Sequence, residues 1–193
     1  MNTLTSVLKV VIAHEDLNTC GEALAVLSRL AAQLESEFQI ESDVWQMDRS
    51  IWDFEMLRDP ELRKQAVTDA ADADMIILSV CDSELPVSVQ AWLESALLMK
   101  DGRPAALVAL LAPAVAASGR PSRPEAALRR LAGKYGLDFF CSANGQSRHI
   151  ASSIESIISR IGDDPSFADE AIPHAAGGRE WGVTDREKQG MTN

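Results

Sequence analysis

Short runs of apolar, largely β-branched residues alternate along this chain with longer segments whose apolar residues recur every three or four positions. Residues 8–13, Leu-Lys-Val-Val-Ile-Ala, form the first such run, and their length and composition predict a buried strand. The segment after it predicts a helix with one buried face. Four residues at helical spacing form that face: Leu24, Leu27, Ala31 and Leu34. Either Asn18 or Thr19 is expected to cap this helix, since both side chains accept hydrogen bonds from backbone amides.

The same alternation continues to residue 161 and predicts further strands and helices. The expected strands span residues 38–47, 73–79, 105–112 and 137–141, and the first of these is placed at a sheet edge because its apolar pattern is imperfect. The expected helices begin at Pro60, near Pro86, at Ser122 or Arg123, and near Ser147. The buried stripe of the helix at Pro60 is expected to consist of Leu62, Ala66, Val67 and Ala70.

Strands that alternate with helices over short connections predict a parallel sheet with helices on both faces. About five strands in some 160 residues indicate an α/β fold with a doubly wound, five-stranded parallel sheet of flavodoxin-like order 2-1-3-4-5, in three α/β/α layers. Its ligand crevice is expected between the ends of the first and third strands. The domain should span residues 1–161 and a polar tail residues 162–193, with Trp181 either docked on the domain or bound to a partner.

Charge and composition narrow the range of partners and compartments. The chain carries 29 acidic and 18 basic residues, a formal net charge of −11, which opposes binding to nucleic acid and to anionic membranes. No run approaches the roughly 20 apolar residues that cross a bilayer. The three cysteines are odd in number and far apart, which favours a reducing compartment. We therefore expect a cytoplasmic protein that binds a small molecule or another protein, with a homodimer as an open alternative.

The third predicted strand and the helix after it resemble a known family. Residues 73–79, Ser83-Glu-Leu-Pro86 and residues 89–94 look like the corresponding strand, loop and helix of the NAD(P)H-dependent FMN reductases and their quinone-reductase relatives. In that family the loop touches the flavin. The resemblance therefore implies FMN as the candidate cofactor and an FMN-dependent NAD(P)H oxidoreductase as an alternative function.

The first loop departs from that family. FMN proteins hold the phosphate there with a turn rich in Ser, Thr, Gly or Arg, whereas this chain has His14-Glu15-Asp16-Leu-Asn18-Thr19-Cys. Two carboxylates within about 5 Å of a phosphate would repel it by several kcal/mol, against a favourable helix-dipole contribution of about 1 kcal/mol. Only Asn18 and Thr19 offer side-chain donors. The loop therefore argues against FMN.

Two tryptophans offer a second link to a planar ligand. Trp45 and Trp52 are expected at the rim of the sheet next to the second strand, where they would either sandwich a ring or cover the exposed sheet edge. We favour the covering role, because an edge strand that is only partly covered needs such side chains.

Response-regulator receiver domains share this fold, and the resemblance implies a second alternative. Receivers hold Mg²⁺ with acidic residues after the first strand, a part that Glu15 and Asp16 can play, and they phosphorylate an aspartate after the third strand. Asp82 lies four residues before Pro86, as the receiver aspartate does before its proline, whereas counting from the start of the strand selects Ser79 instead. The receiver hydroxyl and lysine are replaced by Leu111 and Ser142. The alternative is therefore a degenerate receiver-like domain, with Glu15, Asp16 and Asp82 as weak metal candidates.

Two other chemistries have partial support. Cys20, Cys81 and Cys141 follow predicted strands near His14, a set suited to Zn²⁺, but their spacing is not that of ordinary zinc sites, so we expect small buried thiols. Ser79, Ser83 or Cys81 would be a nucleophile with His14 as its base, but the chain has no Gly-x-Ser-x-Gly elbow.

The predicted function is that of a flavodoxin-like domain without an intact catalytic set, which serves as a small-ligand-binding or protein-interaction module. The ligand-binding candidates are His14, Glu15, Asp16, Asn18, Thr19, Trp45, Trp52, Ser79, Cys81, Asp82 and Ser83. The acidic first turn, the tryptophans, the Ser-x-x-x-Ser-Glu-Leu-Pro segment from Ser79 to Pro86 and the Trp181-Gly182 pair together resemble a group of uncharacterised bacterial proteins, a likeness that implies no activity. Whether an open apolar slot or a filled rim separates the two loops should decide between flavin binding and interaction.

Overall fold

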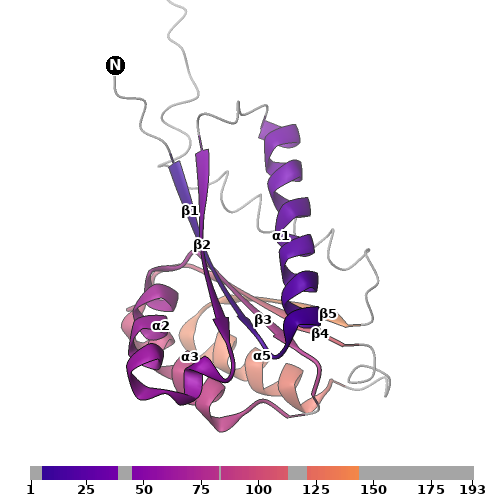
Figure 1. The fold of residues 1–193 in the computed structure, drawn as a ribbon. Helices are drawn as coiled ribbons and strands as arrows, with labels where there is room; N and C mark the ends of the chain where they lie inside the picture. Colours follow the sequence, from indigo (N-terminus) through magenta and orange to yellow (C-terminus); the bar gives the residue numbers. More distant parts are fainter. Residues whose placement is uncertain (1–5, 39–44, 83, 113–120, 144–193) are drawn as a thin grey trace, which may run out of the picture.

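Five parallel strands form a single sheet in the order β2-β1-β3-β4-β5 (Figure 1). The computed structural model describes residues 6–38, 45–82, 84–112 and 121–143. The strands are β1 (Ser6–His14), β2 (Trp45–Asp53), β3 (Met75–Val80), β4 (Ala106–Leu111) and β5 (Asp138–Ala143). This strand order is that of the flavodoxin-like doubly wound fold, so the predicted fold class is confirmed.

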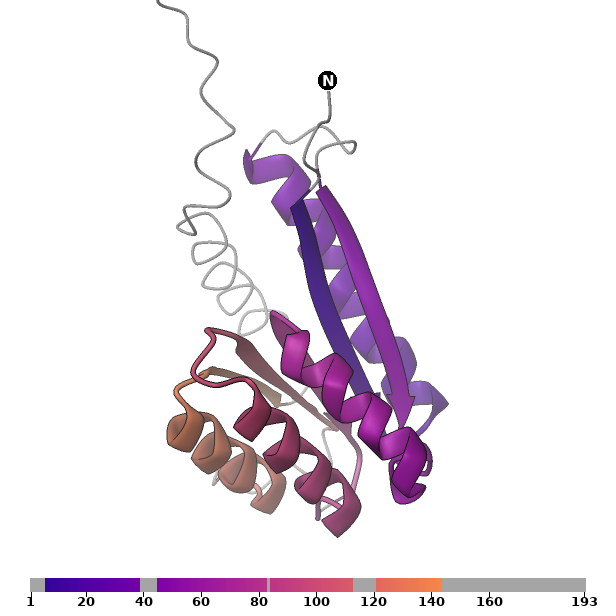
Figure 2. The same ribbon diagram turned by 90° about the vertical axis from the view of Figure 1, so that its left-hand side faces the viewer.

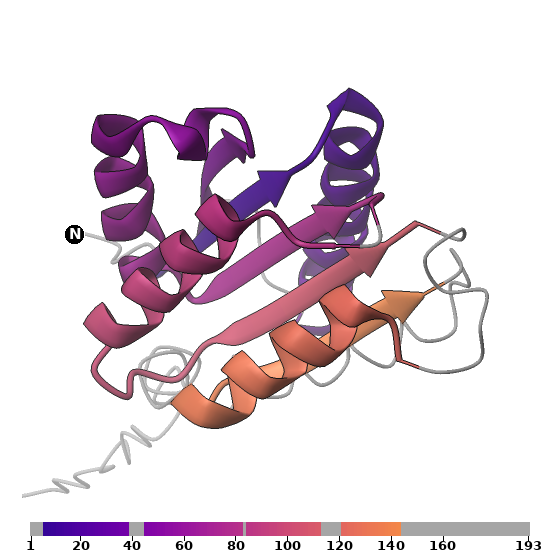
Figure 3. The same cartoon turned by 90° about the horizontal axis from the view of Figure 1, so that it is seen from below.

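Helices cover both faces of the sheet, which gives the predicted three layers. On one face lies α1 (Leu17–Phe38), and on the other lie α2 (Pro60–Asp72), α3 (Val87–Met99) and α5 (Arg123–Tyr135) (Figures 2 and 3). The three helices of the second face lie side by side, with α3 in the middle. A short 3-10 helix, η1 (Met56–Arg58), precedes α2.

Each face of the sheet has its own apolar core, because successive side chains of a strand point to opposite faces. In β1, Val10 and Ile12 pack with Leu27 of α1, whereas Val11 and Ala13 pack in the cluster that also contains Trp92 of α3. All six residues of β3 are buried. A strand buried on both faces reads as a continuous apolar run, which is why the sequence marks β3 and β4 so clearly.

Local capping signals in the sequence fix several element ends. Asp59 caps α2 by accepting hydrogen bonds from the amides of Glu61 and Leu62, and Pro60 is the first helical residue. Ser122 caps α5 through the amide of Glu125, and Gly136, with a φ of 71°, ends that helix. The predicted starts of α2 and α5 are therefore confirmed.

Three details of the prediction are wrong. The second strand is Trp45–Asp53 rather than residues 38–47, because α1 extends to Phe38 and all nine residues of β2 pair with β1. Long-range pairing here outweighs the weak local alternation. The first helix begins at Leu17, before the predicted caps Asn18 and Thr19. In α2, Leu62 is 39% exposed, and Ala71 is buried beside Ala66 and Ala70 instead.

None of the helices within the described ranges is long and apolar enough to cross a membrane. The helix predicted for residues 147–161 and the polar tail 162–193 with Trp181 lie outside the described residues.

Candidate functional site

The candidate site lies where β1 and β3 end side by side. His14, the last residue of β1, is in register with Ser79 of β3, and the strand order reverses at this pair. Doubly wound sheets bind their ligands at such a reversal, outside the carboxyl ends of the strands. Only Glu15 and Asp16 separate β1 from α1, while residues 81–86 connect β3 to α3.

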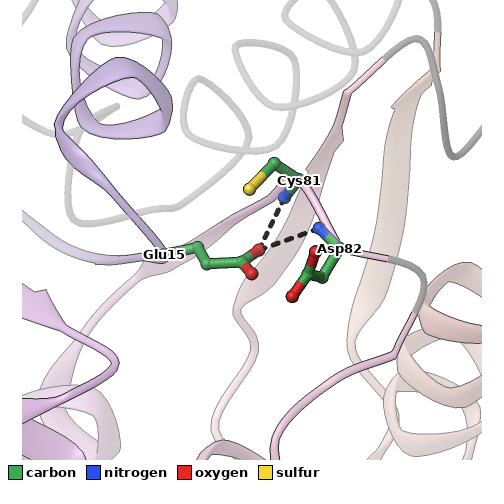
Figure 4. A group of neighbouring side chains, drawn as sticks. All are labelled: Glu15, Cys81 and Asp82. Carbon is green, nitrogen blue, oxygen red and sulfur yellow. Dashed lines mark hydrogen bonds between the residues drawn. The ribbon is translucent and has the colours of Figure 1, made fainter.

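Glu15 joins the two loops directly (Figure 4). Its carboxylate oxygen Oε2 accepts hydrogen bonds from the backbone amides of Cys81 at 2.7 Å and Asp82 at 3.0 Å. Its own amide donates to the Ser79 carbonyl at 3.2 Å. Two adjacent amides at the end of β3 are the kind of donors that hold an anionic ligand in other proteins. In this chain a side chain of the protein already occupies them.

Asp16 occupies the start of α1 in a similar way. Its Oδ1 accepts a hydrogen bond from the Thr19 amide at 2.8 Å, and the Thr19 hydroxyl accepts one from the Asp16 amide at 2.9 Å. This reciprocal pair is a capping box with Asp16 as the N-cap. The predicted donor Thr19 is thereby only 4% exposed and already bonded, whereas Asn18 is exposed. The free amides of the helix end, where a phosphate would bind, are reduced in number.

The hydrogen bonds set the charges of the cluster. Burial by itself would raise the pKa of Glu15, but the amides of Asp82 and Cys81 stabilise its anion and hold its pKa below the usual range. The pKa of Asp82 is raised, chiefly because its side chain shares a hydrogen bond with Glu15 and faces the charge of Glu15. Burial, followed by the Glu15 carboxylate, raises the pKa of Cys81 to about 11. The thiol is therefore protonated at neutral pH.

Glu15, Cys81 and Asp82 present ligand atoms that all lie within 4.8 Å of one another. Oxygen ligands of this kind suit a hard divalent cation, although the Cys81 thiol would first have to lose its proton. Of the weak metal candidates, Glu15 and Asp82 are brought together, while Asp16 is engaged in the helix cap. Within the described ranges no ligating group of three contains Cys20, Cys141 or His14, so the alternative zinc set does not assemble there.

His14 and Ser79 are buried below the cluster rather than exposed at its surface. They lie in one row across the sheet with Asp53 of β2, and His14 Nδ1 lies 3.9 Å from Asp53 Oδ2. Ser79 is 0% exposed, and its hydroxyl has no hydrogen-bond partner among the described residues. A nucleophile must reach its substrate, so a fully buried Ser79 does not suit that role. Ser83 lies outside the described residues.

The two tryptophans do not share a rim. Trp45 begins β2 and Trp52 is its second-last residue, so about 23 Å of strand separates them. Trp52 is 8% exposed, packs in the core of the second face, and donates from Nε1 to Asp69 of α2 at 3.2 Å. The prediction that both lie at the same rim, where the strands end, is therefore wrong, because the strand was placed several residues too early.

The two residues predicted as phosphate acceptors, Asp82 and Ser79, differ in burial. Asp82 is exposed in the loop two residues beyond β3, whereas Ser79 lies inside the strand and is buried. Of the two registers predicted for the phosphate-accepting residue, only the one with Asp82 reaches solvent. The last residue of β4 is Leu111, and Ser142 of β5 is in register with Leu110.

Leu17 is the residue at this site that the sequence did not single out. It is the first residue of α1, directly after Asp16, and it is 86% exposed. Its spacing to Leu24 continues the apolar stripe of the helix, so periodicity alone predicts burial. Leu17 is nevertheless exposed in the described part of the chain, which only the tertiary structure reveals.

Comparisons with known proteins add little to this geometry. No family model matches the sequence, and no curated protein matches it. Among solved structures, the crystal structure of a flavodoxin-like domain from Synechococcus sp. is similar, with 14% sequence identity and a TM-score of 0.43 over 79% of this chain and 95% of that chain. Because this similarity is low, the fold is assigned from the strand order instead.

Proposed function

We propose that this domain is a protein-interaction module that binds its partner at the carboxyl edge of the sheet, over the loops that Glu15 joins. The observation that carries the proposal is the pair of hydrogen bonds from the Cys81 and Asp82 amides to the Glu15 carboxylate. They fill the position at which this fold holds a small ligand. Among the described residues, two backbone donors at this edge are thereby already engaged by the protein itself.

The chemistry of that surface suggests the chemistry of the partner. Glu15, Asp16 and Asp82 place three carboxylates together, and the almost fully exposed Leu17 lies beside them. A cationic side chain next to an aliphatic one would complement this arrangement. The partner is therefore inferred to be a protein segment in which Lys or Arg flanks an apolar residue.

A panel of fluorescent peptides tests this inference. We expect peptides that combine Lys or Arg with an aliphatic residue to bind in fluorescence anisotropy, with an affinity that falls as salt increases. Leu17→Ser and Asp82→Asn should each weaken binding about tenfold. Leu62→Ser and Asp48→Asn are the matched controls, because they remove one exposed leucine and one exposed carboxylate away from the site. Equal losses in the controls would refute the proposed surface.

FMN-dependent NAD(P)H reduction is the alternative that this geometry favours less. A phosphate at α1 would meet the Asp16 carboxylate, and a flavin over β3 would compete with Glu15 for two amides. We expect no absorbance near 450 nm in the purified protein and no quenching of Trp fluorescence on FMN titration. Tight stoichiometric FMN binding would overturn the interaction proposal.

One observation favours a second candidate, a divalent-cation site of the receiver-like kind. The carboxylates of Glu15 and Asp82 lie together at the exposed end of β3. If the cluster binds Mg²⁺, calorimetry should detect binding that disappears in Asp82→Asn and weakens in Asp16→Asn, while Asp48→Asn leaves it unchanged. Acyl-phosphate labelling of Asp82 would extend the likeness to phosphorylation. No heat of binding at millimolar Mg²⁺ would remove this candidate.

A further inference from the structure

The outer edge of β2 pairs with no strand among the described residues. β2 lies at one border of the sheet, and its only strand neighbour there is β1 (Figure 2). All nine residues of β2 are in unbroken register with β1, and the strand contains no proline, glycine or lysine. Proteins commonly protect an edge with a short strand, a bulge, a proline or a lysine, because its backbone amides and carbonyls can bind a further strand. β2 has none of these devices.

The backbone groups at this edge belong to alternate residues of β2. The Phe54 amide, one residue beyond the strand, donates to the His14 carbonyl at 2.9 Å. In a parallel pair every second residue of a strand directs its amide and carbonyl to the same neighbour, so the even-numbered residues of β2 bond to β1. The amides and carbonyls of Arg49, Ile51 and Asp53 therefore point away from the sheet.

The side chains of these three residues form a pattern of cation, apolar group and anion. They lie on the face of β2 opposite Trp52, which packs in the core beside α2 and α3. Ile51 is 43% exposed, and the side chain of Asp53 is 33% exposed. Arg49 is exposed and forms no ion pair with any described residue. Reversing the direction of the strand exchanges the two charges, so the pattern complements a second copy of itself.

We propose that two copies of this chain pair through the open edges of β2, with the strands antiparallel and the two-fold axis at Ile51. In this register Ile51 lies opposite Ile51 of the other copy, and Arg49 of each copy lies opposite Asp53 of the other. Backbone hydrogen bonds exchanged at the three positions number about six. The sheet then continues through both copies, as it does when a protein binds an added strand. Such a contact is self-complementary, as a two-fold interface must be.

The charges select this register. An axis at Arg49 would bring two guanidinium groups together, and an axis at Ser50 would place Arg49 opposite Ile51. Parallel pairing in register would place each charge opposite a like charge. Opposite charges directly across an antiparallel pair stabilise it, whereas like charges destabilise it. Of these arrangements, only the antiparallel one with its axis at Ile51 pairs both charges.

The size of the contact predicts a modest affinity. Residues 49–53 span about 17 Å of strand, which is a smaller contact than a standard interface. The net charge of −11 on each copy also opposes association. We expect a reversible equilibrium between monomer and dimer with a dissociation constant of about 10–100 μM. β1 separates β2 from the loop with Asp82, so this inference does not rest on the proposed function.

Sedimentation equilibrium of the full chain tests the pairing through a charge exchange. The wild type should shift from monomer to dimer between about 1 and 200 μM. Arg49→Asp and Asp53→Arg each place like charges opposite one another, so each variant alone should dimerise at least tenfold more weakly. An equimolar mixture of the two should dimerise again, because both positions then carry opposite charges across the axis.

Two further variants complete this experiment. Arg130→Asp is the matched control for Arg49→Asp, since it makes the same charge change at an exposed arginine of α5 and should leave the dimer intact. Ile51→Lys puts two ammonium groups at the axis and should weaken the dimer at least tenfold. It also decides the question if circular dichroism shows that Asp53→Arg does not fold.

Hydrogen exchange identifies the strand that forms the contact. The Ile51 amide should exchange several times more slowly at 200 μM than at 5 μM in the wild type, and at equal rates in Arg49→Asp. A wild type that stays monomeric at 200 μM would overturn the proposal. So would a dimer that survives Arg49→Asp and Ile51→Lys, a mixture of the two folded charge variants that stays monomeric, or Ile51 exchange that does not depend on concentration.

Discussion

At the scale of single residues, Glu15 determines the character of the candidate site. Its backbone amide continues the pairing of β1 with β3, and its carboxylate binds two amides of the loop after β3. One side chain thus connects the loops that in this fold usually enclose a ligand. Its negative charge also controls its neighbours, since it contributes to the raised pKa of both Asp82 and Cys81.

The reactivity of Cys81 should report on that charge. Burial and then Glu15 raise the pKa of Cys81 to about 11, so its thiol should react slowly with iodoacetamide at neutral pH. In Glu15→Gln the charge is lost and the pKa should fall, which increases the thiolate fraction roughly three- to tenfold at mildly alkaline pH. Mass spectrometry of the Cys81 peptide over time measures the rate. An unchanged rate, or an equal increase in Asp48→Asn, would contradict this account.

At the scale of elements, the ends of helices depend on identifiable groups. The carboxyl end of α2 is held from α3 and the turn after it: Lys100 donates to the carbonyls of Ala71 and Ala73, and Arg103 donates to the Ala71 carbonyl at 2.7 Å. Lys100 is only 3% exposed, so its ammonium group replaces water as the partner of those carbonyls. This cap joins α2 to α3 where neither helix has a basic residue in its own last turn.

Lys100 should make stability depend on alkaline pH. Burial, followed by the charge of Arg103, lowers its pKa to about 8 in the folded protein, from 10.5 for an ordinary lysine. Between these values the unfolded chain binds a proton that the folded chain does not, so this group's contribution to the free energy of unfolding rises with pH. Lys100→Met should lose that rise, and it should also cost about 1–3 kcal/mol at pH 7 by leaving carbonyls unpaired. Urea unfolding at pH 7 and at both ends of this pH range measures both effects.

Lys64→Met is the control for Lys100, because Lys64 is exposed on α2. It should keep the pH dependence of the wild type. A parallel pH profile for Lys100→Met and the wild type would show that Lys100 does not titrate differently on folding.

Substitution by alanine should change the free energy of unfolding in opposite directions at two glycines near the end of α5. Gly136 has a φ of 71°, in the left-handed region, and Gly136→Ala should lower the free energy of unfolding by about 1 kcal/mol. Gly133 lies within the helix, and a Cβ there would meet nothing within 4 Å. Gly133→Ala should therefore raise the free energy of unfolding by about 0.5–1 kcal/mol. Thermal unfolding followed by circular dichroism compares the two. Shifts of the same sign would exclude the backbone explanation.

At the scale of the whole molecule, net charge opposes compactness. The formal charge of −11 is unevenly spread, because α5 collects four of the basic residues. The acidic residues in the rest of the chain repel one another when folding brings them together.

Salt should therefore stabilise the folded chain. Raising NaCl from about 20 to 300 mM shortens the screening length from roughly 20 Å to below 10 Å, and the melting temperature should rise by a few degrees. Asp48→Lys reduces the net charge to about −9, so the salt-dependent rise should be smaller in this variant. A melting temperature that falls with salt would mean that attractive ion pairs dominate instead.

The sequence alone determined the alternation of buried strands and helices and most helix starts, because these depend on local physics, whereas the strand order was inferred from the fold type that such an alternation indicates. Buried strands such as β3 require unbroken apolar runs, and caps such as Asp59 and Ser122 act within one helical turn. The acidic first loop was also readable, and the structure brings Glu15 of that loop together with Cys81 and Asp82. The sequence could not predict contacts between residues that are distant in the chain.

The tertiary structure decided the bounds of β2, because those depend on nine pairs with β1 rather than on local alternation. It also decided that Ser79 is buried, that Trp45 and Trp52 lie at opposite ends of a strand, and that Leu17 is exposed. Above all it decided the role of Glu15. The sequence places a carboxylate beside the crevice, but only the approach of β3 to β1 determines that this carboxylate binds the two amides itself.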